Sequence, residues 1–342
     1  MLTGLSRMVK CAVVLMLGIT TVSPASAQEI NLYTTREPGL MKPLIEGFTQ
    51  ASGIKVNSIF VKDGLTERVA AEGAKSPADV LMTVDIGNLI DLVEKGLAQP
   101  VQSPVLEAAI PAHLRGKDNQ WFTLSTRARV LYAAKDLKLT SFTYEELADP
   151  KWQGRVCIRA GQHPYNTAMI AAFLAKHGEA RTEAWLRGIK ANLARKATGG
   201  DRDVARDIIG GICDIGIGNS YYVGLMRSGS GGADQKKWGD GIDVVLPTFA
   251  GGGTLVNISG AAIARQSPNR AAAQRFLEYL VSDEGQKIYA EMNYEHPVKA
   301  GAPVHPIMAA LGPLRVDPLP LTEIARLRAT ASKLVDKVGF DQ

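Results

Sequence analysis

The sequence has 342 residues, with 39 Lys and Arg against 34 Asp and Glu, which gives a formal net charge of +5. The excess is small and the acids and bases are interspersed, so the chain lacks the basic blocks of a nucleic-acid-binding protein. No apolar run approaches the ~20 residues that a membrane-spanning helix needs. We therefore expect no nucleic-acid partner and no membrane span, and the length suits two domains of ordinary size.

The N-terminal segment 1–27 is typical of a secretory signal peptide. Arg7 and Lys10 precede a short apolar run, and small residues lead up to Ala27. We expect cleavage near Ala27 and Gln28, with export to the periplasm of the remaining 315 residues. Because the leader carries two basic residues and no acid, the net charge of the mature chain is expected to be +3.

Strand and helix patterns alternate in the first third of the mature chain. Period-two alternation with β-branched residues predicts strands, and apolar residues spaced three and four apart predict helices. The expected strands are 29–35, 55–61 and 78–84, and the expected helices are 38–52, 64–74 and 87–96. Such alternation predicts a mainly parallel sheet with helices on both faces.

A long extended segment follows an irregular, proline-containing stretch. Residues 121–135 exceed the usual strand length, which favours a segment that crosses from one domain to another. A second series follows, with strands expected at 154–160, 214–219 and 254–264, and helices at 167–178, 182–194, 202–211, 269–282, 283–292 and 320–338. The stretch 229–253 is Gly-rich and polar.

Two α/β domains joined by extended crossings indicate the fold class of a two-lobed, type II periplasmic binding protein. In open α/β sheets, ligands bind beyond the carboxyl ends of the strands, so the cleft between the lobes is the expected site. The expected divisions are a signal peptide at 1–27, a first lobe at 28–127, a second lobe at 128–250, a return to the first lobe at 251–298, and a connector with a C-terminal helix at 299–342, mostly on the second lobe.

The two cysteines of the mature chain, Cys157 and Cys213, lie in segments that predict buried strands. Export to an oxidising compartment permits a disulfide if neighbouring strands bring the two sulfur atoms together. Buried free thiols are equally compatible with the pattern, so both alternatives stay open.

Three tyrosines occupy unusual positions for their residue type. Tyr221 and Tyr222 are adjacent and directly follow the expected strand 214–219, and Tyr165 lies in a loop marked by Gly, Pro and Asn. A strand sends adjacent side chains to opposite faces, whereas a loop can aim both at one point. Phenolate oxygen is a hard anionic ligand that suits a hard, highly charged cation such as Fe3+. On residue type alone, packing on the lobe surface is the better interpretation of the pair.

Motifs along nearly the whole mature chain point to one known family. The most specific is the paired tyrosine of GNSYYVG, and the Tyr-Asn of PYNTA comes next. Weaker motifs are YTTREPGL, SPADVLMTVDIGNL, STRARVLYAAK, LADPKWQGRVCIR, TLVNISGAAIA and NYEHPVKAG. With these motifs the chain resembles the ferric-ion-binding proteins of bacterial iron ABC transporters, which are transferrin-like.

The resemblance implies that Tyr165, Tyr221 and Tyr222 hold Fe3+ from one lobe. Some members of that family add a His-Tyr pair where this chain has Arg-Glu-Pro at 36–38, so those two ligands are missing here. Other members use a His and a Glu of the first lobe, and no such His can be placed. The absence of these first-lobe ligands implies a three-tyrosine site that is completed by a synergistic anion, with carbonate expected, or by water.

An anion added to three tyrosinates and Fe3+ needs its own positive partner, because the tyrosinates already cancel the charge of the ion. A guanidinium fork suits planar carbonate, and the resemblance favours Arg36 and Arg127 as anion holders. Arg129 shares a strand face with Arg127 and stays an alternative. His163 is expected to be a solvated loop residue, with a distant fourth ligand of the ion as the alternative. The remaining candidates for a supporting role are Asp85, Asn166, Thr167 and Asn219, and helix capping also explains the last three.

The leading hypothesis is a monomeric periplasmic binding protein that captures Fe3+, closes by a hinge motion and is recognised by an inner-membrane ABC permease. A binding protein for a polyamine, thiamine or sulfate is the alternative within transport. A secreted enzyme on the same fold is the third hypothesis, but the chain shows no convincing Ser/His or Cys/His arrangement.

Overall fold

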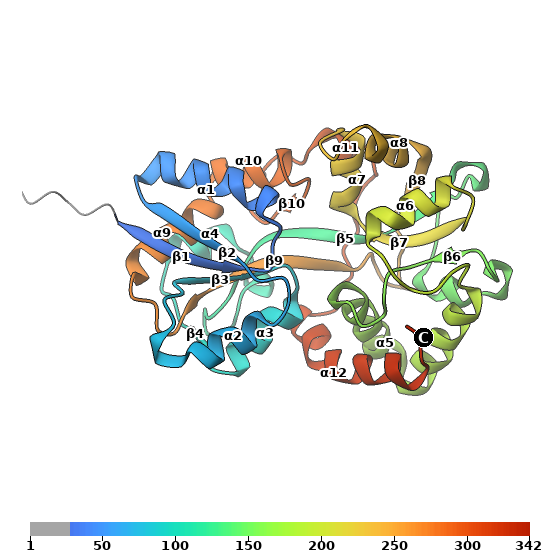
Figure 1. Ribbon diagram of the computed structural model, residues 1–342, viewed down its shortest axis with the longest axis horizontal. Helices are drawn as coiled ribbons and strands as arrows, with labels where there is room; N and C mark the ends of the chain where they lie inside the picture. Colours follow the sequence, from blue (N-terminus) through green and yellow to red (C-terminus); the bar gives the residue numbers. More distant parts are fainter. Residues whose placement is uncertain (1–27) are drawn as a thin grey trace, which may run out of the picture.

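The computed structural model describes residues 28–342, so the expected signal peptide lies outside the described part. Two α/β lobes lie side by side, and strands run from one lobe into the other (Figure 1). The two-lobed α/β fold expected from the sequence is therefore confirmed.

The first lobe, which contains β1, is built on strands in the order β2-β1-β3-β9-β5. Their bounds are β1 Glu29–Thr34, β2 Lys55–Phe60, β3 Val80–Thr83, β9 Val256–Ala264 and β5 Phe122–Ala134. Strands β2, β1 and β3 are parallel, as expected, whereas β9 is antiparallel to both β3 and β5. The sheet is thus mixed rather than mainly parallel, because the strands that cross between the lobes run in opposite directions.

Helices cover both faces of this first sheet (Figure 1). Their apolar faces meet it in a buried core, where the rings of Phe48 and Phe276 pack edge to face with centroids 4.9 Å apart. The helices are α1 Pro38–Ser52, α2 Leu65–Glu72, α3 Ile86–Glu94, α4 Pro104–Ala109, α9 Arg270–Leu280 and α10 Asp283–Glu291, and the short edge strands are β4 Ala98–Gln99 and β10 His296–Pro297.

The second lobe surrounds the other half of β5. That half pairs antiparallel with β7 and β8, and β7 pairs parallel with β6. The elements are β6 Val156–Cys157, β7 Ile215–Asn219, β8 Ile242–Val245, α5 Pro164–Asn192, α6 Asp201–Ile209, α7 Ser220–Arg227 and α8 Ala233–Gly241. Helix α5 contains the two helices expected from the sequence, joined at Gly178, where φ is 77°. Helix α8 lies in the Gly-rich stretch that gave no helical pattern.

Two elements bridge the lobes. Residues 122–128 of β5 pair with β9, and residues 129–134 pair with β7 and β8, so this strand belongs to both sheets. The C-terminal helix α12, Leu321–Lys337, packs against α5 of the second lobe and also against α3 of the first. The short helix α11, Pro306–Ala309, packs on α7. The lobe boundaries expected from the sequence stay predictions.

Five short 3-10 helices complete the described secondary structure: Gly73–Lys75, Ala112–Leu114, Lys135–Leu137, Tyr144–Ala148 and Pro150–Trp152. A disulfide joins Cys157 of β6 to Cys213 just before β7, with the two Cα atoms 5.8 Å apart. Of the two alternatives that the sequence left open, the structure therefore supports the disulfide over two buried free thiols.

Candidate functional site

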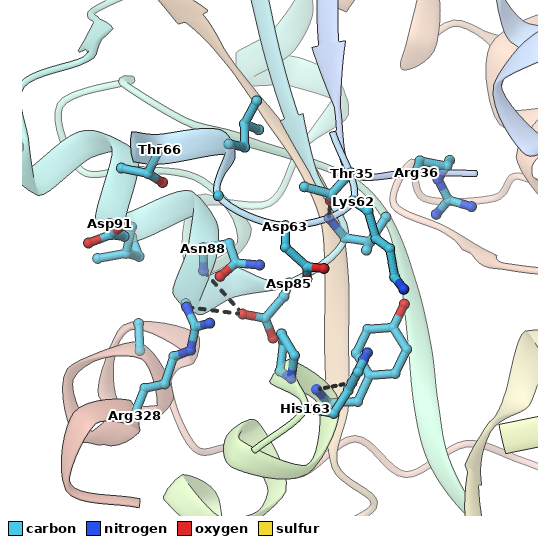
Figure 2. Close-up of a pocket in the computed structure, with 18 of the residues that line it drawn as sticks. Thr35, Arg36, Lys62, Asp63, Thr66, Asp85, Asn88, Asp91, His163 and Arg328 are labelled. Carbon is cyan, nitrogen blue, oxygen red and sulfur yellow. Dashed lines mark hydrogen bonds and ion pairs between the residues drawn. The ribbon is translucent and has the colours of Figure 1, made fainter. Parts of the chain in front are cut away.

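A cavity of about 1160 Å³ lies between the lobes. Its walls come from the loop after β1, the start of α3, the starts of α5 and α7, and α12. Figure 2 shows polar and charged side chains facing this cavity, among them Arg36, Lys62 and Asp63. The cavity is the cleft that the fold class predicts, and all three candidate tyrosines line it.

The structure brings the three tyrosines together in this cleft. The hydroxyl oxygens of Tyr165 and Tyr221 are 3.4 Å apart, and the ring centroids of Tyr221 and Tyr222 are 4.1 Å apart. None of the three side chains is more than 8% exposed. They lie in the first turns of α5 and α7 rather than in loops. Helix α7 begins directly after β7, so a helical turn and not a loop aims the adjacent pair.

The protein environment keeps the phenols of the pair protonated at neutral pH in the absence of metal. Burial, and then the neighbouring phenols of Tyr165 and Tyr222, raise the pKa of Tyr221 well above its ordinary value. Burial is also the main cause that raises the pKa of Tyr222. A trivalent cation at bonding distance reverses this preference, as metals do for bound thiols and water. The phenols of Tyr221 and Tyr222 are therefore neutral when no metal is bound, and a bound cation would be needed to ionise them.

The two arginines expected to hold an anion lie beside the tyrosines but differ in their partners. Arg36 Nη2 is 2.6 Å from Glu295 Oε1 and also donates to Ser259. Arg127 Nη1 donates to Ser259 Oγ at 3.2 Å, and its Cζ lies 5.6 Å from the ring centroid of Tyr165. Within residues 28–342, Arg127 Nε and Nη2 have no hydrogen-bond partner although the side chain is buried. Arg127 thus has two unpartnered nitrogens within the described residues, whereas Arg36, Arg129 and Arg159 each have one, Nε.

Arg159 is a cleft residue that the sequence did not reveal. Its Cζ lies 5.1 Å from the ring centroid of Tyr165, and its Nη1 is 3.2 Å from Asp201 Oδ1. Burial alone would raise the pKa of Asp201, but Arg129 and Arg159 hold it below its ordinary value. This carboxylate therefore stays charged and fixes Arg159 next to the phenols. Nothing in the local sequence pattern around Arg159, which lies at the end of an expected strand, indicates that this side chain contacts a cleft tyrosine.

Arg129 and two of the expected supporting residues, Asn166 and Asn219, form a buried polar network behind the tyrosines, whereas Thr167 bonds only to its own helix start. Arg129 donates to Asp201 at 2.7 Å, to Asn219 at 3.1 Å and to Asn166 at 2.6 Å. Thr167 donates to the carbonyl of residue 164 at 3.1 Å. Nη1 and Nη2 of Arg129 both donate to protein acceptors, so this arginine orients residues behind the tyrosines.

Asp85 lies on the first-lobe wall of the cleft. Its Oδ1 accepts from the Asn88 amide at 3.1 Å and so caps α3, and its Oδ2 accepts from Asn257 at 2.7 Å. Figure 2 shows Asn88 and Arg328 beside it, and Arg328 Nη1 is 3.9 Å from Asp85 Oδ1. Both carboxylate oxygens are therefore engaged by the protein.

His163 is not the solvated loop residue expected from the sequence. It precedes α5, and its Nδ1 accepts from the Tyr165 amide at 3.2 Å, which caps the helix. Burial, followed by the charge of Arg159, lowers its pKa to about 3. The ring is therefore neutral at physiological pH. The expectation of a fully solvated ring was wrong because His163 is only partly exposed: it lines the cleft and caps α5, although its neighbour Gln162 is exposed.

Among residues 28–342, no three His, Cys, Asp or Glu side chains are grouped so that they could hold a metal ion. Tyrosine is outside that set, so the tyrosine cluster remains the candidate for a hard cation. Within the same residues, no helix has the length and apolar character needed to cross a membrane.

The two lobes, the crossing strands and the polar cleft between them define a solute-binding protein. Residues 33–295 match the family described as bacterial extracellular solute-binding protein, and the chain belongs to that family. The family resemblance seen in the sequence is confirmed at this level.

Relatives of the chain have names that refer to iron. It is 40% identical over 321 residues to iron uptake protein A1 of Synechocystis sp., covering 93% of this chain and 89% of that protein. It is 26% identical over 345 residues to the major ferric iron-binding protein of Neisseria meningitidis serogroup B, covering 94% and 96%. These relatives match almost the full length of the chain.

Solved structures give the same result. A Bordetella ferric binding protein is 63% identical, with a TM-score of 0.84 over 92% of this chain and 100% of that chain. A Trichodesmium protein solved in complex with iron and citrate ligands is 40% identical, with a TM-score of 0.84 over 91% and 99%.

Proposed function

We propose that this protein binds Fe3+ in the periplasm and delivers it to an inner-membrane ABC permease. The observation that carries the proposal is the convergence of three buried phenols, from two helix starts of one lobe, on a polar cleft. The names of the relatives support the same cargo. The protein acts as a carrier, and we propose that it works as a monomer.

Tyr165, Tyr221 and Tyr222 are the proposed ligands of the ion. Three tyrosinates neutralise Fe3+ completely, so the loaded cluster adds no net charge to the interior. The hard phenolate oxygens favour a trivalent cation over softer divalent metals. Binding releases the phenol protons, so the affinity for Fe3+ rises with pH.

A synergistic anion, with carbonate expected, fills the coordination positions that the tyrosines leave open. Arg127 supports this proposal, because a buried guanidinium with unpaired nitrogens is costly unless a counter-ion joins it. Arg36 is the second proposed anion holder. Arg159 adds positive charge on the side of Tyr165. One relative was solved with citrate beside iron, so the identity of the anion here is part of the test below.

Closure of the lobes completes the proposed cycle. All three phenols belong to the second lobe, whereas Arg36 and Asp85 belong to the first, so closing about the crossing strands brings the two sets together. We propose that the permease recognises the closed form. The proposed lobe boundaries are 28–127, 128–250, 251–298 and 299–342, with α12 in contact with both lobes.

Visible absorption of the iron-loaded protein tests the assignment. Addition of Fe3+ with bicarbonate is expected to give a phenolate-to-iron charge-transfer band in the wild type, and the band is expected to vanish in a variant with Phe at 165, 221 and 222. Tyr33→Phe, which removes a phenol outside the tyrosine cluster, is the matched control and keeps the band. An absent band in the wild type, together with thermal stabilisation by sulfate or a polyamine, would favour the alternative solutes.

A further inference from the structure

A buried carboxylate lies where the two crossing strands meet, beside both anion-holding arginines. Glu295, between α10 and β10, is 1% exposed. Its Oε1 is 2.6 Å from Arg36 Nη2. Its Oε2 accepts hydrogen bonds from the hydroxyls of Ser125 and Ser259, the latter at 3.1 Å. Ser125 and Ser259 are opposite each other in β5 and β9, so Glu295 is held by both crossing strands.

Glu295 remains ionised in this position. Burial alone would raise the pKa of its carboxyl, but Arg36 and Arg127 hold that pKa below its ordinary value. The result is a fixed negative charge next to the groups that would receive an incoming anion. Its effect on the two arginines is unequal. Arg36 Nη2 donates to Glu295 and Ser259, which leaves Nε of Arg36 without a partner, whereas Arg127 has no hydrogen bond to Glu295 and keeps both Nε and Nη2 unpartnered within the described residues.

Resting on the function proposed above, we propose that Glu295 is an internal competitor of the synergistic anion. It occupies Nη2 of Arg36 in the iron-free protein, so Arg127, with two unpartnered nitrogens against one on Arg36, offers the larger set of free donors to the anion. The exogenous anion gains Arg36 only by sharing it with Glu295. Glu295 therefore sets both the affinity for the anion and the amount of negative charge that the site accepts.

The charge at Glu295 also selects among classes of anion. A small planar dianion such as carbonate can bond to Arg127 while it keeps its charge away from the carboxylate. A tricarboxylate such as citrate places more negative charge near Glu295, so it is penalised more strongly. An internal carboxylate that opposes the anion also favours release, because loss of the anion leaves Arg36 paired rather than unpaired.

Glu295→Gln tests the competition, because it removes the charge and keeps the shape and one acceptor oxygen. The charge-transfer band at fixed Fe3+ is titrated with bicarbonate and, separately, with citrate. We expect the half-saturating anion concentration to fall by about 10- to 100-fold, the size of one unit charge acting over ~6 Å at an effective dielectric constant of ~20. The fall is expected to be larger for citrate than for bicarbonate. Glu295→Asp, which keeps the charge, is expected to remain close to the wild type.

A double-mutant cycle with Arg36→Gln separates competition from simple positioning. Arg36→Gln alone leaves Glu295 unpaired beside the anion and is expected to weaken anion binding. The double variant removes both charges and is expected to return close to the wild-type affinity. If Arg36 were the principal holder of the anion, the double variant would stay as weak as Arg36→Gln. If Glu295→Gln alone proves too unstable to titrate, comparing the double variant with Arg36→Gln and the wild type still distinguishes competition from positioning.

The matched control is Asp207→Asn, which removes another buried carboxylate in an ion pair, 2.6 Å from Arg195 Nε and outside the residues that line the cleft. It is expected to change stability but not the anion titration. An anion affinity that is unchanged or weakened in a folded Glu295→Gln variant would overturn the inference. That outcome differs from failure of the proposed function, in which the wild type itself shows no charge-transfer band.

Discussion

Arg127 carries a charge that the iron-free protein compensates only in part. The side chain is 1% exposed, one nitrogen donates to Ser259 at 3.2 Å, and two nitrogens have no partner within residues 28–342. We predict that Arg127→Met, which removes the charge and keeps much of the volume, makes the protein more stable in the absence of anion. The same substitution is expected to abolish the dependence of iron binding on bicarbonate.

The magnitude follows from opposing contributions. Burying an ion with incomplete compensation costs several kcal/mol. The substitution loses one hydrogen bond from a charged donor, about 1.5–3 kcal/mol. It also loses the contact between Arg127 and the Tyr165 ring, 5.6 Å from Cζ to the centroid, which contributes about 0.5–2 kcal/mol. The substitution also removes a positive charge that keeps the buried Glu295 ionised. We therefore expect a net gain of only about 1 kcal/mol for the variant, which corresponds to a rise in Tm of about 2 °C for a chain of this size.

Denaturant and thermal unfolding in carbonate-free buffer measure this gain, with Arg127→Lys as the control that keeps the charge and is expected to show no gain. Repeating both measurements with Fe3+ and bicarbonate measures the stabilisation by ligand, which the wild type shows and Arg127→Met largely loses. A variant that is less stable than the wild type by more than about 1 kcal/mol would refute the reasoning. Arg127 would then be a charge that the protein itself satisfies.

Three further predictions concern protons and covalent structure. Burial raises the pKa of the Tyr221 phenol, so this phenol is protonated before Fe3+ binds and must release its proton on binding. The affinity of the protein for Fe3+ is therefore expected to fall as pH falls. Proton uptake, or no proton change, in a weakly buffered titration would contradict this. Because the folded-state pKa of His163 is about 3, below the ordinary value of 6.5, its stabilising contribution is complete above pH 6.5 and is lost as pH falls towards 3. His163→Asn keeps a capping acceptor but has no titrating ring. The Tm of the wild type is therefore expected to fall more than the Tm of this variant between pH 7 and pH 4. Replacing Cys157 and Cys213, which are 56 residues apart, with serine is expected to lower the free energy of unfolding by about 2–4 kcal/mol. An equal Tm for that variant and the wild type, both without reductant, would show that the cross-link does not constrain the second lobe.

Much of the fold could be predicted from the sequence, because hydrophobic periodicity reports local structure directly. The unbroken pattern at 121–135 identified the long crossing strand, and strand–helix alternation identified the lobes. Strand direction is a non-local property, so the antiparallel insertion of β9 was not predicted and the sheets are mixed. Helix α8 was missed because four of its nine residues are Gly or Asp, which are also common in turns.

The site was predictable only where a distinctive residue pattern marks it. The adjacent Tyr221 and Tyr222 stand out in the sequence, and their helical setting changes the local geometry without changing the residues. Arg159 and Glu295 carry no such pattern, because a strand-end arginine and a connector glutamate acquire their roles only when distant segments pack together. His163 was misjudged for the same reason, since a Gly- and Pro-marked loop indicates exposure unless the tertiary structure buries it.

The position of β9 has a consequence for the order in which the protein folds after export. Its residues 256–264 fill the gap between β3, which ends at Thr83, and β5 in the first sheet. As the chain emerges N-terminus first, β3 therefore has an unpaired edge until more than half of the remaining chain has crossed the membrane. Pairings between segments so far apart form slowly and leave an edge open to aggregation. The first lobe is thus completed after the second has emerged, and, with the export proposed above, chaperones of the receiving compartment would be expected to act on the exposed edge of β3 during that interval.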